Sequence, residues 1–314
     1  MPDSPLGNFR RYAGLVSAAL RGAGAFAPEA EDASAVQVER GTVFPLALTG
    51  RLDDAAASGT VGRLIELGTQ ADAPYRLAAL AVVDRAGHHR PAYRPLLVYS
   101  WLQAFRLVYE TLPRSQFGRW EEGLRPWCDV LESTLMAAPW PAGTVPAARG
   151  GAAGEAAWAA LALHVAGRVF VRDTWTDLAN DAFGNLGRRQ TPGGAFLSAD
   201  GSDNPEAGWH HELVLLHAVA SYAAQAEDRN AAAAVKRATE YHSRETQPDH
   251  ASTQPWALFA FVWNESTRPF ADALLHAAAV QAADAPGGVG GVPSLLLGDA
   301  LYCLRLFVDP PGSG

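Results

Sequence analysis

Cysteine, lysine and long apolar runs are scarce in this sequence. The two cysteines, Cys128 and Cys303, stand far apart and outside any short metal-ligand spacing, which excludes a disulfide framework and predicts buried free thiols. Lys236 is the only lysine, and the acidic side chains outnumber the basic ones by 33 to 25. Because phosphate binding needs clustered basic side chains, we expect no nucleic acid partner.

No stretch of the chain approaches the roughly 20 uninterrupted apolar residues that a membrane span needs. His164 and Arg168 interrupt the best candidate, residues 156–171. Near the N-terminus, the apolar run 13–20 is too short for an export signal and ends at Arg21. We therefore expect a cytoplasmic protein without a membrane span.

What the chain does contain is enough apolar material for a large core. Of its 314 residues, 48% are hydrophobic and 18% are charged, a balance typical of a globular protein. We expect a single helical domain over 1–314, with an N-terminal helix and a short β element in about 1–50.

Apolar residues recur at intervals of three and four along most of the sequence, which predicts helix after helix. The predicted helices cover 5–21, 96–112, 121–138, 155–180, 209–226, 230–245, 255–263, 269–283 and 293–307, with further helical spacing at 61–67 and 77–83. Residues 36–48 instead alternate between apolar and other positions and predict a strand or hairpin. The Pro/Gly/Ala-rich stretch 139–154 is predicted to be a domain linker or a loop over a site.

This pattern predicts an all-α fold. Helices joined by turns pack as hairpins, and a chain of this length holds about six of them, the number that closes an α/α toroid. An open helical array is the alternative, although no repeat signature of the solenoid families is present.

The densest group of functional residue types lies between residues 209 and 250, where five of the nine histidines fall. His210 and His217 are seven residues apart, so on an ideal helix they project within about 20° of each other. The predicted catalytic residues are His210, His217, His242, Glu245, Asp249 and His250. In this interpretation a histidine serves as a base and an acidic residue orients it.

The alternative is that these imidazoles cap helix ends, bond to carbonyl groups and fill a semi-polar core. No H-E-x-x-H spacing is present, because Leu213, Val214 and Leu215 follow His211-Glu212. We therefore expect no metal site and no cofactor.

Polar loops precede tryptophans at two predicted helix starts. Asp203 lies in the loop before Trp209, and Asp249 lies in the loop before Trp256. Since indole faces stack on sugar rings, Trp209, Trp256 and Asp203 are the candidate substrate-binding residues. Helix capping and core packing are the alternative roles.

Asp173, Asp177 and Asp181 are spaced by four residues and start on one helical face, as a magnesium site for a diphosphate substrate would require. The metal-binding motifs of terpene synthases are incomplete, because Ala57 and Arg188 stand where carboxylates are expected. Solvated helix charge is the favoured interpretation, and an isoprenoid diphosphate enzyme is a lesser alternative.

The region from Thr191 to Trp263 includes the segments GGAFLSADGSDNPEAGWHHELVLLHAVASYA and YHSRETQPDHASTQPW. It resembles segments of bacterial α/α-toroid proteins, a group with terpenoid cyclase-like, polysaccharide lyase-like and uncharacterised members. The resemblance implies a toroid fold. It carries over no catalytic residue, because no defining motif of a named enzyme family is present.

Two functions from different classes follow. The first is a carbohydrate-active enzyme, a lyase or hydrolase, with a histidine or Tyr222 or Tyr241 as base and a carbohydrate or another small molecule as ligand. The second is a non-catalytic helical binding or scaffold protein with a protein partner. The loop 198–208 and the turn 245–254 are where we expect an active site.

Overall fold

A computed structural model describes the parts of the chain that form the helical body. The described residues are 5–22, 43–48, 62, 93–109, 114–137, 145–146, 149–198, 205–246, 256–284 and 291–308. Residues 61, 63–67 and 77–83, where the spacing predicts helix, lie outside these ranges.

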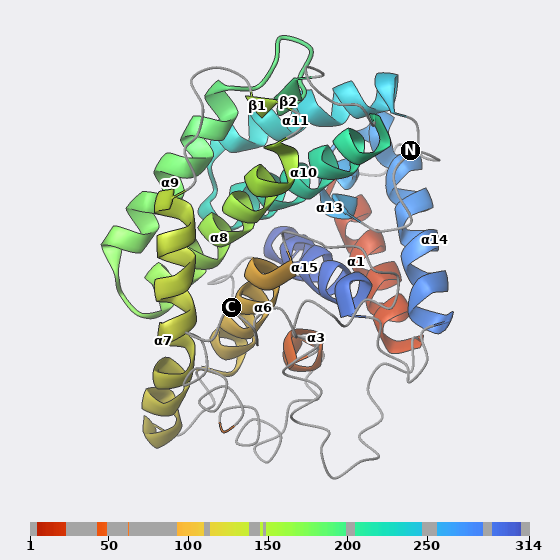
Figure 1. Cartoon of the computed structure of the whole chain (residues 1–314). Helices are drawn as coiled ribbons and strands as arrows, with labels where there is room; N and C mark the ends of the chain where they lie inside the picture. The colour runs from red at the N-terminus through yellow and green to blue at the C-terminus, as the bar shows by residue number, and fades with distance from the viewer. Residues whose placement is uncertain are drawn as a thin grey trace.

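The fold is all-α, as the sequence pattern predicts (Figure 1). The helices in chain order are α1 (Pro5–Gly22), α3 (Val43–Leu48), α6 (Tyr93–Val108), α7 (Arg114–Ala137), α8 (Gly150–Val169), α9 (Asp173–Arg188), α10 (Pro205–Ala226), α11 (Arg229–Glu245), α13 (Leu258–Val262), α14 (Arg268–Asp284) and α15 (Gly291–Val308). A 3-10 turn, η2, covers Glu265–Thr267. The strands β1 (Val145–Pro146) and β2 (Leu197–Ser198) pair in parallel.

Helix α8 lies at the centre of one half of the molecule and packs against α6, α7, α9 and α10 (Figure 1). It is rich in alanine, the best helix former, and it is buried on nearly all sides, so it shows no polar stripe. Small residues bring its neighbours close. A Cβ atom on Gly154 would lie 2.9 Å from the Val214 side chain of α10.

Helix α15 lies at the centre of the other half, where α1, α3, α10, α13 and α14 surround it (Figure 1). Its residues 295–304 are all buried, and among them Asp299 is the only charged one. Helices α9 and α11 pack on the outside and have one buried and one exposed face. None of the described helices is both long enough and apolar enough to cross a membrane.

The predicted single helix 155–180 is in fact a hairpin. Helix α8 ends at Val169, α9 begins at Asp173, and Val171 between them adopts a positive φ of 55°. Gly167 lets α9 return closely, because a Cβ atom there would lie 2.4 Å from Thr176 Oγ1. The turn lacks the usual glycine or proline signal, so the spacing of apolar residues alone predicted one uninterrupted helix across it.

The predicted strand at 36–48 is wrong for residues 43–48, which form α3. Phe44 and Leu48 are both buried, and their spacing of four places them on one helical face against α6 and α15. The same apolar residues also alternate, so the pattern alone did not distinguish helix from strand. Residues 36–42 lie outside the described ranges.

The predicted loop or linker 139–154 is shorter than expected, because α8 begins at Gly150 and residues 145–146 form β1. Likewise, residues 183–188 of the predicted polar loop 183–208 belong to α9. The closed toroid of six hairpins and the single domain over 1–314 stay predictions.

The turn at Val171 carries backbone strain that a substitution can test. A β-branched residue with positive φ is disfavoured by about 1–2 kcal/mol, and this side chain is 84% exposed, so its removal costs little packing. We expect Val171→Asn to raise the free energy of unfolding by about 1 kcal/mol in urea denaturation. Val280→Asn, at an exposed helical position, is the control and should stabilise nothing. Equal effects of the two substitutions would rule out strain at residue 171.

Candidate functional site

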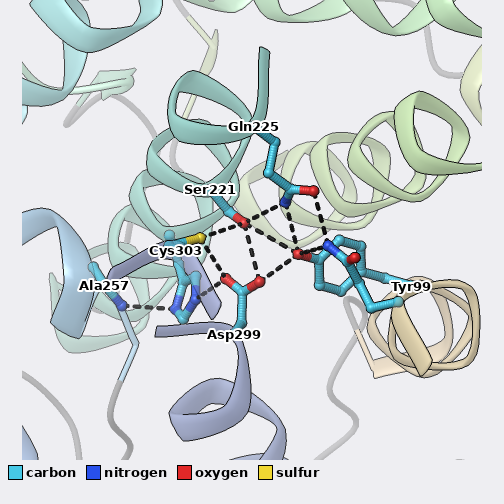
Figure 2. Close-up of polar contacts among 8 residues, drawn as sticks. Tyr99, Ser221, Gln225, Ala257, Asp299 and Cys303 are labelled. Carbon is cyan, nitrogen blue, oxygen red and sulfur yellow. Dashed lines mark hydrogen bonds and ion pairs between the residues drawn. The ribbon is translucent and has the colours of Figure 1, made fainter. Parts of the chain in front are cut away.

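Three helices bury a connected group of polar side chains, here called the Asp299 network (Figure 2). Its side chains are Tyr99 and Gln103 of α6, His217, Ser221 and Gln225 of α10, and Asp299 and Cys303 of α15. Every one of them is buried, with Gln225 the most exposed at 5%. The network therefore lies inside the helical body.

The spacing of these residues explains why they meet. Each helix contributes side chains at intervals of four, which lie on one helical face. In α15 the two positions are Asp299 and Cys303, and in α6 they are Tyr99 and Gln103. Polar residues four apart inside otherwise apolar helices are the sequence signal of this network. Of its residues, only His217 was among the predicted catalytic residues.

Four side chains of the network face the Asp299 carboxylate. Its Oδ1 accepts from the Tyr99 hydroxyl and from Ser221 Oγ at 3.1 Å. Its Oδ2 accepts from His217 Nε2 at 2.9 Å and faces the Cys303 thiol at 3.9 Å. An ionised carboxylate has only acceptors, so these donors satisfy Asp299 as a buried anion.

His217 is held as a neutral imidazole by its two partners. Its Nδ1 accepts the backbone N–H of Ala257 at 3.0 Å, which places the ring proton on Nε2, where it is donated to Asp299. The rings of Trp158 and Trp256 pack against it at 5.3 and 5.8 Å between ring centroids. Both ring nitrogens are thus used within the fold, and the catalytic role of His217 stays a prediction.

The network contains serine, histidine and aspartate, the residue types of a nucleophilic catalytic triad, but the serine does not bond to the histidine. A serine nucleophile needs a histidine to take its proton, but Ser221 Oγ donates to Asp299 and accepts from Gln225 Nε2 at 3.0 Å. Burial and the nearby Asp299 charge raise the pKa of the Cys303 thiol and of the Tyr99 hydroxyl well above their usual values. Both groups therefore remain protonated and poorly nucleophilic.

Loss of the central carboxylate should destabilise the fold. Asp299→Asn replaces an acceptor oxygen by an NH₂ group that faces donors, so we expect the free energy of unfolding to fall by on the order of 3 kcal/mol. Asp272→Asn is the control, because Asp272 is exposed and, among the described residues, accepts only from Tyr12. If both variants unfolded at the same urea concentration, the network would not stabilise the helices.

A second buried cluster joins α10 to β2 and α11. Glu212, 3% exposed, accepts the backbone N–H groups of Phe196 (3.1 Å) and Leu197. His242 Nδ1 faces Thr246 Oγ1 at 3.2 Å, and its Nε2 lies 3.9 Å from Glu212 Oε2. Burial lowers the pKa of His242 to about 3, so near neutral pH this is a neutral histidine beside a carboxyl group.

Glu212 makes stability depend on pH. Burial raises its pKa to about 7, although the two backbone hydrogen bonds oppose the shift. A folded-state pKa above the unfolded value of 4.5 means that the neutral acid favours the fold and that this stability is lost as pH rises from about 4.5 to 7. The shift corresponds to about 3 kcal/mol.

We therefore expect the wild type to lose stability relative to Glu212→Gln as the pH rises from 4.5 to 7, because the glutamine cannot ionise. Urea denaturation at several pH values measures this difference. Glu245→Gln, an exposed carboxylate on α11, should follow the wild type throughout. A constant difference between Glu212→Gln and the wild type at every pH would exclude the role of Glu212.

The structure separates some of the predicted site residues and leaves others undescribed. Trp209 and His210 are half-buried in α10, and the His210 ring lies 6.2 Å from that of the buried Trp256. Glu245 is exposed, whereas His242 is fully buried, so the carboxyl group beside His242 is that of Glu212. Asp203, Asp249 and His250 lie outside the described residues. The predicted cleft between 198–208 and 245–254 therefore stays a prediction.

A cavity of about 600 Å³, here called the arginine pocket, opens at the end of α10. Its lining comes from α1, α6, α8, α10, α11 and α15, together with Trp263 and the turn between α10 and α11. The lining residues are Phe9, Arg106, Arg168, Ala223, Ala224, Gln225, Glu227, Asp228, Arg229, Ala232, Trp263, Leu306 and Phe307. Sequence reasoning missed this pocket because its residues come from segments far apart in the chain.

Gln225 belongs both to the arginine pocket and to the Asp299 network. Its Nε2 donates to the Tyr99 hydroxyl at 2.8 Å, and its Oε1 accepts from Gln103 Nε2 at 2.8 Å. Arg106 Nη1 lies 3.4 Å from the same Oε1, and Arg168 Nη1 donates to the Gln225 carbonyl oxygen at 2.9 Å. The buried network thus fixes the inner end of the pocket.

Other groups of the described residues form no comparable site. A depression of about 950 Å³ has a lining from α7 alone. Asp173, Asp177 and Asp181 are all exposed on α9, and the described residues hold no group of three or more metal-ligating side chains. The arginine pocket is therefore the candidate site.

Comparison with known proteins adds no family to this picture. No protein-family model, no curated protein and no solved structure matches the chain.

Proposed function

We propose that this chain is a ligand-binding protein that holds a small organic molecule in the arginine pocket. The observation that carries the proposal is a cavity of about 600 Å³ whose lining combines aromatic, small apolar and charged side chains from six helices. Small-molecule sites commonly measure about 300–1,000 Å³ and combine an apolar wall with a few placed polar groups.

Binding without catalysis is favoured by how the buried polar groups are used. His217 donates to Asp299 and accepts from Ala257, and the Ser221 hydroxyl donates to Asp299. These groups stabilise the helices and orient Gln225 at the pocket. They leave no lone pair of His217 for a substrate proton.

A carbohydrate-active enzyme is the second candidate. Trp263 and Phe307 present aromatic surface beside Gln225 and Asp228, a combination that suits a sugar. His210 and Trp209 remain its candidate residues on α10, together with Asp203, Asp249 and His250 outside the described residues. An isoprenoid diphosphate enzyme has less support, because Asp173, Asp177 and Asp181 are exposed.

Filling the pocket tests the proposal. Ala232 of α11 lines the pocket, and the adjacent Ala233 is exposed and outside it. Two fluorescent probes suit the cavity: anilinonaphthalene sulfonate and the uncharged phenylnaphthylamine. We expect saturable binding of at least one probe by the full chain, and an affinity loss of about tenfold or more in Ala232→Phe, because the larger side chain occupies the ligand's volume.

Ala233→Phe is the matched control, since it adds the same ring one position away, and it should bind like the wild type. Thermal melting of both variants confirms that they fold. The proposal fails if neither probe binds saturably, or if Ala232→Phe and Ala233→Phe bind with equal affinity.

A further inference from the structure

Two arginine side chains that line the arginine pocket contact the same residue, and of the two Arg106 is half-buried and Arg168 is exposed. Both contact Gln225, which is buried: Arg106 reaches its side-chain oxygen at 3.4 Å, and Arg168 donates to its carbonyl oxygen at 2.9 Å. The two guanidinium groups come from different helices, α6 and α8, and contact two oxygen atoms of one residue of α10. The part of the pocket at Gln225 therefore carries two positive charges.

These charges are not neutralised within the part of the chain that the structure describes. Neither guanidinium lies within 4.0 Å of a described carboxylate, and each has five N–H donors of which one is bonded. Arg106 also lies over the Tyr302 ring, 5.6 Å from its centroid, an interaction that preserves its charge. Within the described residues, most of the donors of both side chains are thus left for a ligand.

The positive charges of Arg106 and Arg168 also act on the pKa of the nearby His164. It lies on α8 one turn before Arg168 and is 4% exposed. Burial lowers its pKa to about 4, and the charges of Arg168 and Arg106 act in the same direction. An anion bound between the arginines would meet two cations.

The Asp299 network holds this cationic end in place. Because Gln225 Nε2 donates to Tyr99 and Ser221, the amide cannot flip without losing both bonds, and its oxygen stays toward Arg106. A preorganised donor set binds an anion without an added cost of ordering the side chains.

Another part of the pocket lining is apolar and aromatic. Phe307, 38% exposed, stacks on Phe9 at 4.9 Å between ring centroids and meets Trp263 edge-on at 6.0 Å. Such a surface accommodates the apolar body of a ligand.

The turn between α10 and α11 adds negative charge at the outer edge. Glu227 is exposed there, and Asp228 accepts the N–H groups of Asn230 and Ala231 at the start of α11. Arg229, which follows Asp228 and also lines the pocket, offsets part of this negative charge. The placement of an anionic group therefore rests on the attraction to Arg106 and Arg168.

We propose that the ligand is an amphipathic small molecule whose anionic head group, a carboxylate or a similar oxyanion, binds Arg106 and Arg168. Its apolar body lies against Phe9, Trp263 and Phe307. This inference rests on the proposed ligand-binding function, and it adds the chemical class of the ligand.

The two probes test the head group directly, because they share the anilinonaphthalene body and differ in the sulfonate. We expect the wild-type chain to bind anilinonaphthalene sulfonate about tenfold or more tightly than phenylnaphthylamine, as a charge-assisted contact with arginine predicts. Raising the salt concentration should weaken binding of the sulfonate probe and leave that of the neutral probe unchanged.

Arginine variants locate the effect. Arg106→Gln and Arg168→Gln should each weaken binding of the sulfonate probe about tenfold and change binding of the neutral probe less than about twofold. Arg119→Gln is the matched control, since Arg119 is exposed on α7 and outside the pocket, and it should leave both affinities unchanged. Arg168 also bonds to the backbone at the end of α10, so thermal melting must show that Arg168→Gln still folds. Arg106→Gln measures the effect of the other arginine on binding independently.

The outcomes separate this inference from the proposed function. If the neutral probe binds as tightly as the sulfonate and Ala232→Phe weakens both, the pocket binds ligands but the anionic class is wrong. If Arg106→Gln and Arg168→Gln fold and bind the sulfonate like the wild type, the arginines do not hold the head group. If neither probe binds saturably, the ligand-binding function itself fails.

Discussion

The buried carboxylate of Asp299 is the constraint on which the arrangement of the helices depends. An ionised group without water must receive hydrogen bonds from the protein, and its donors come from α6, α10 and α15 itself. Through His217 the same interaction reaches Ala257 at the start of α13. Four helices are thereby held in one relative position, which apolar packing alone does not specify as narrowly.

The same network connects the core to the surface cavity. Gln225 is the last residue of the hydrogen-bonded network and lines the arginine pocket, where it contacts both Arg106 and Arg168. Figure 2 shows its hydrogen bonds within the network. The buried hydrogen bonds thus hold the Gln225 amide in place, while Arg106 and Arg168 carry the positive charge of the pocket. In the proposed function, preorganisation of this kind lowers the entropic cost of binding.

Much of the fold was predictable, and the reasons are local. Apolar residues at intervals of three and four identified most of the helices, and α8 lies largely within the predicted helix 155–180. The errors arose where tertiary packing decided. Val171 turns the chain without a sequence signal, and Phe44 and Leu48 have a spacing that fits a helix as well as a strand. Of the Asp299 network the sequence marked His217 but not its partners, and of the arginine pocket it marked no residue.

The sequence by itself determined the helical class, the shortage of lysine and cysteine and the concentration of histidines in 209–250, because these depend on composition and local periodicity. Only the tertiary structure decided what those residues meet. It paired His217 with Asp299, placed Glu212 beside His242, and joined Arg106 to Arg168 at Gln225. Such contacts join side chains many residues apart, and their geometry follows from helix packing that no local pattern encodes.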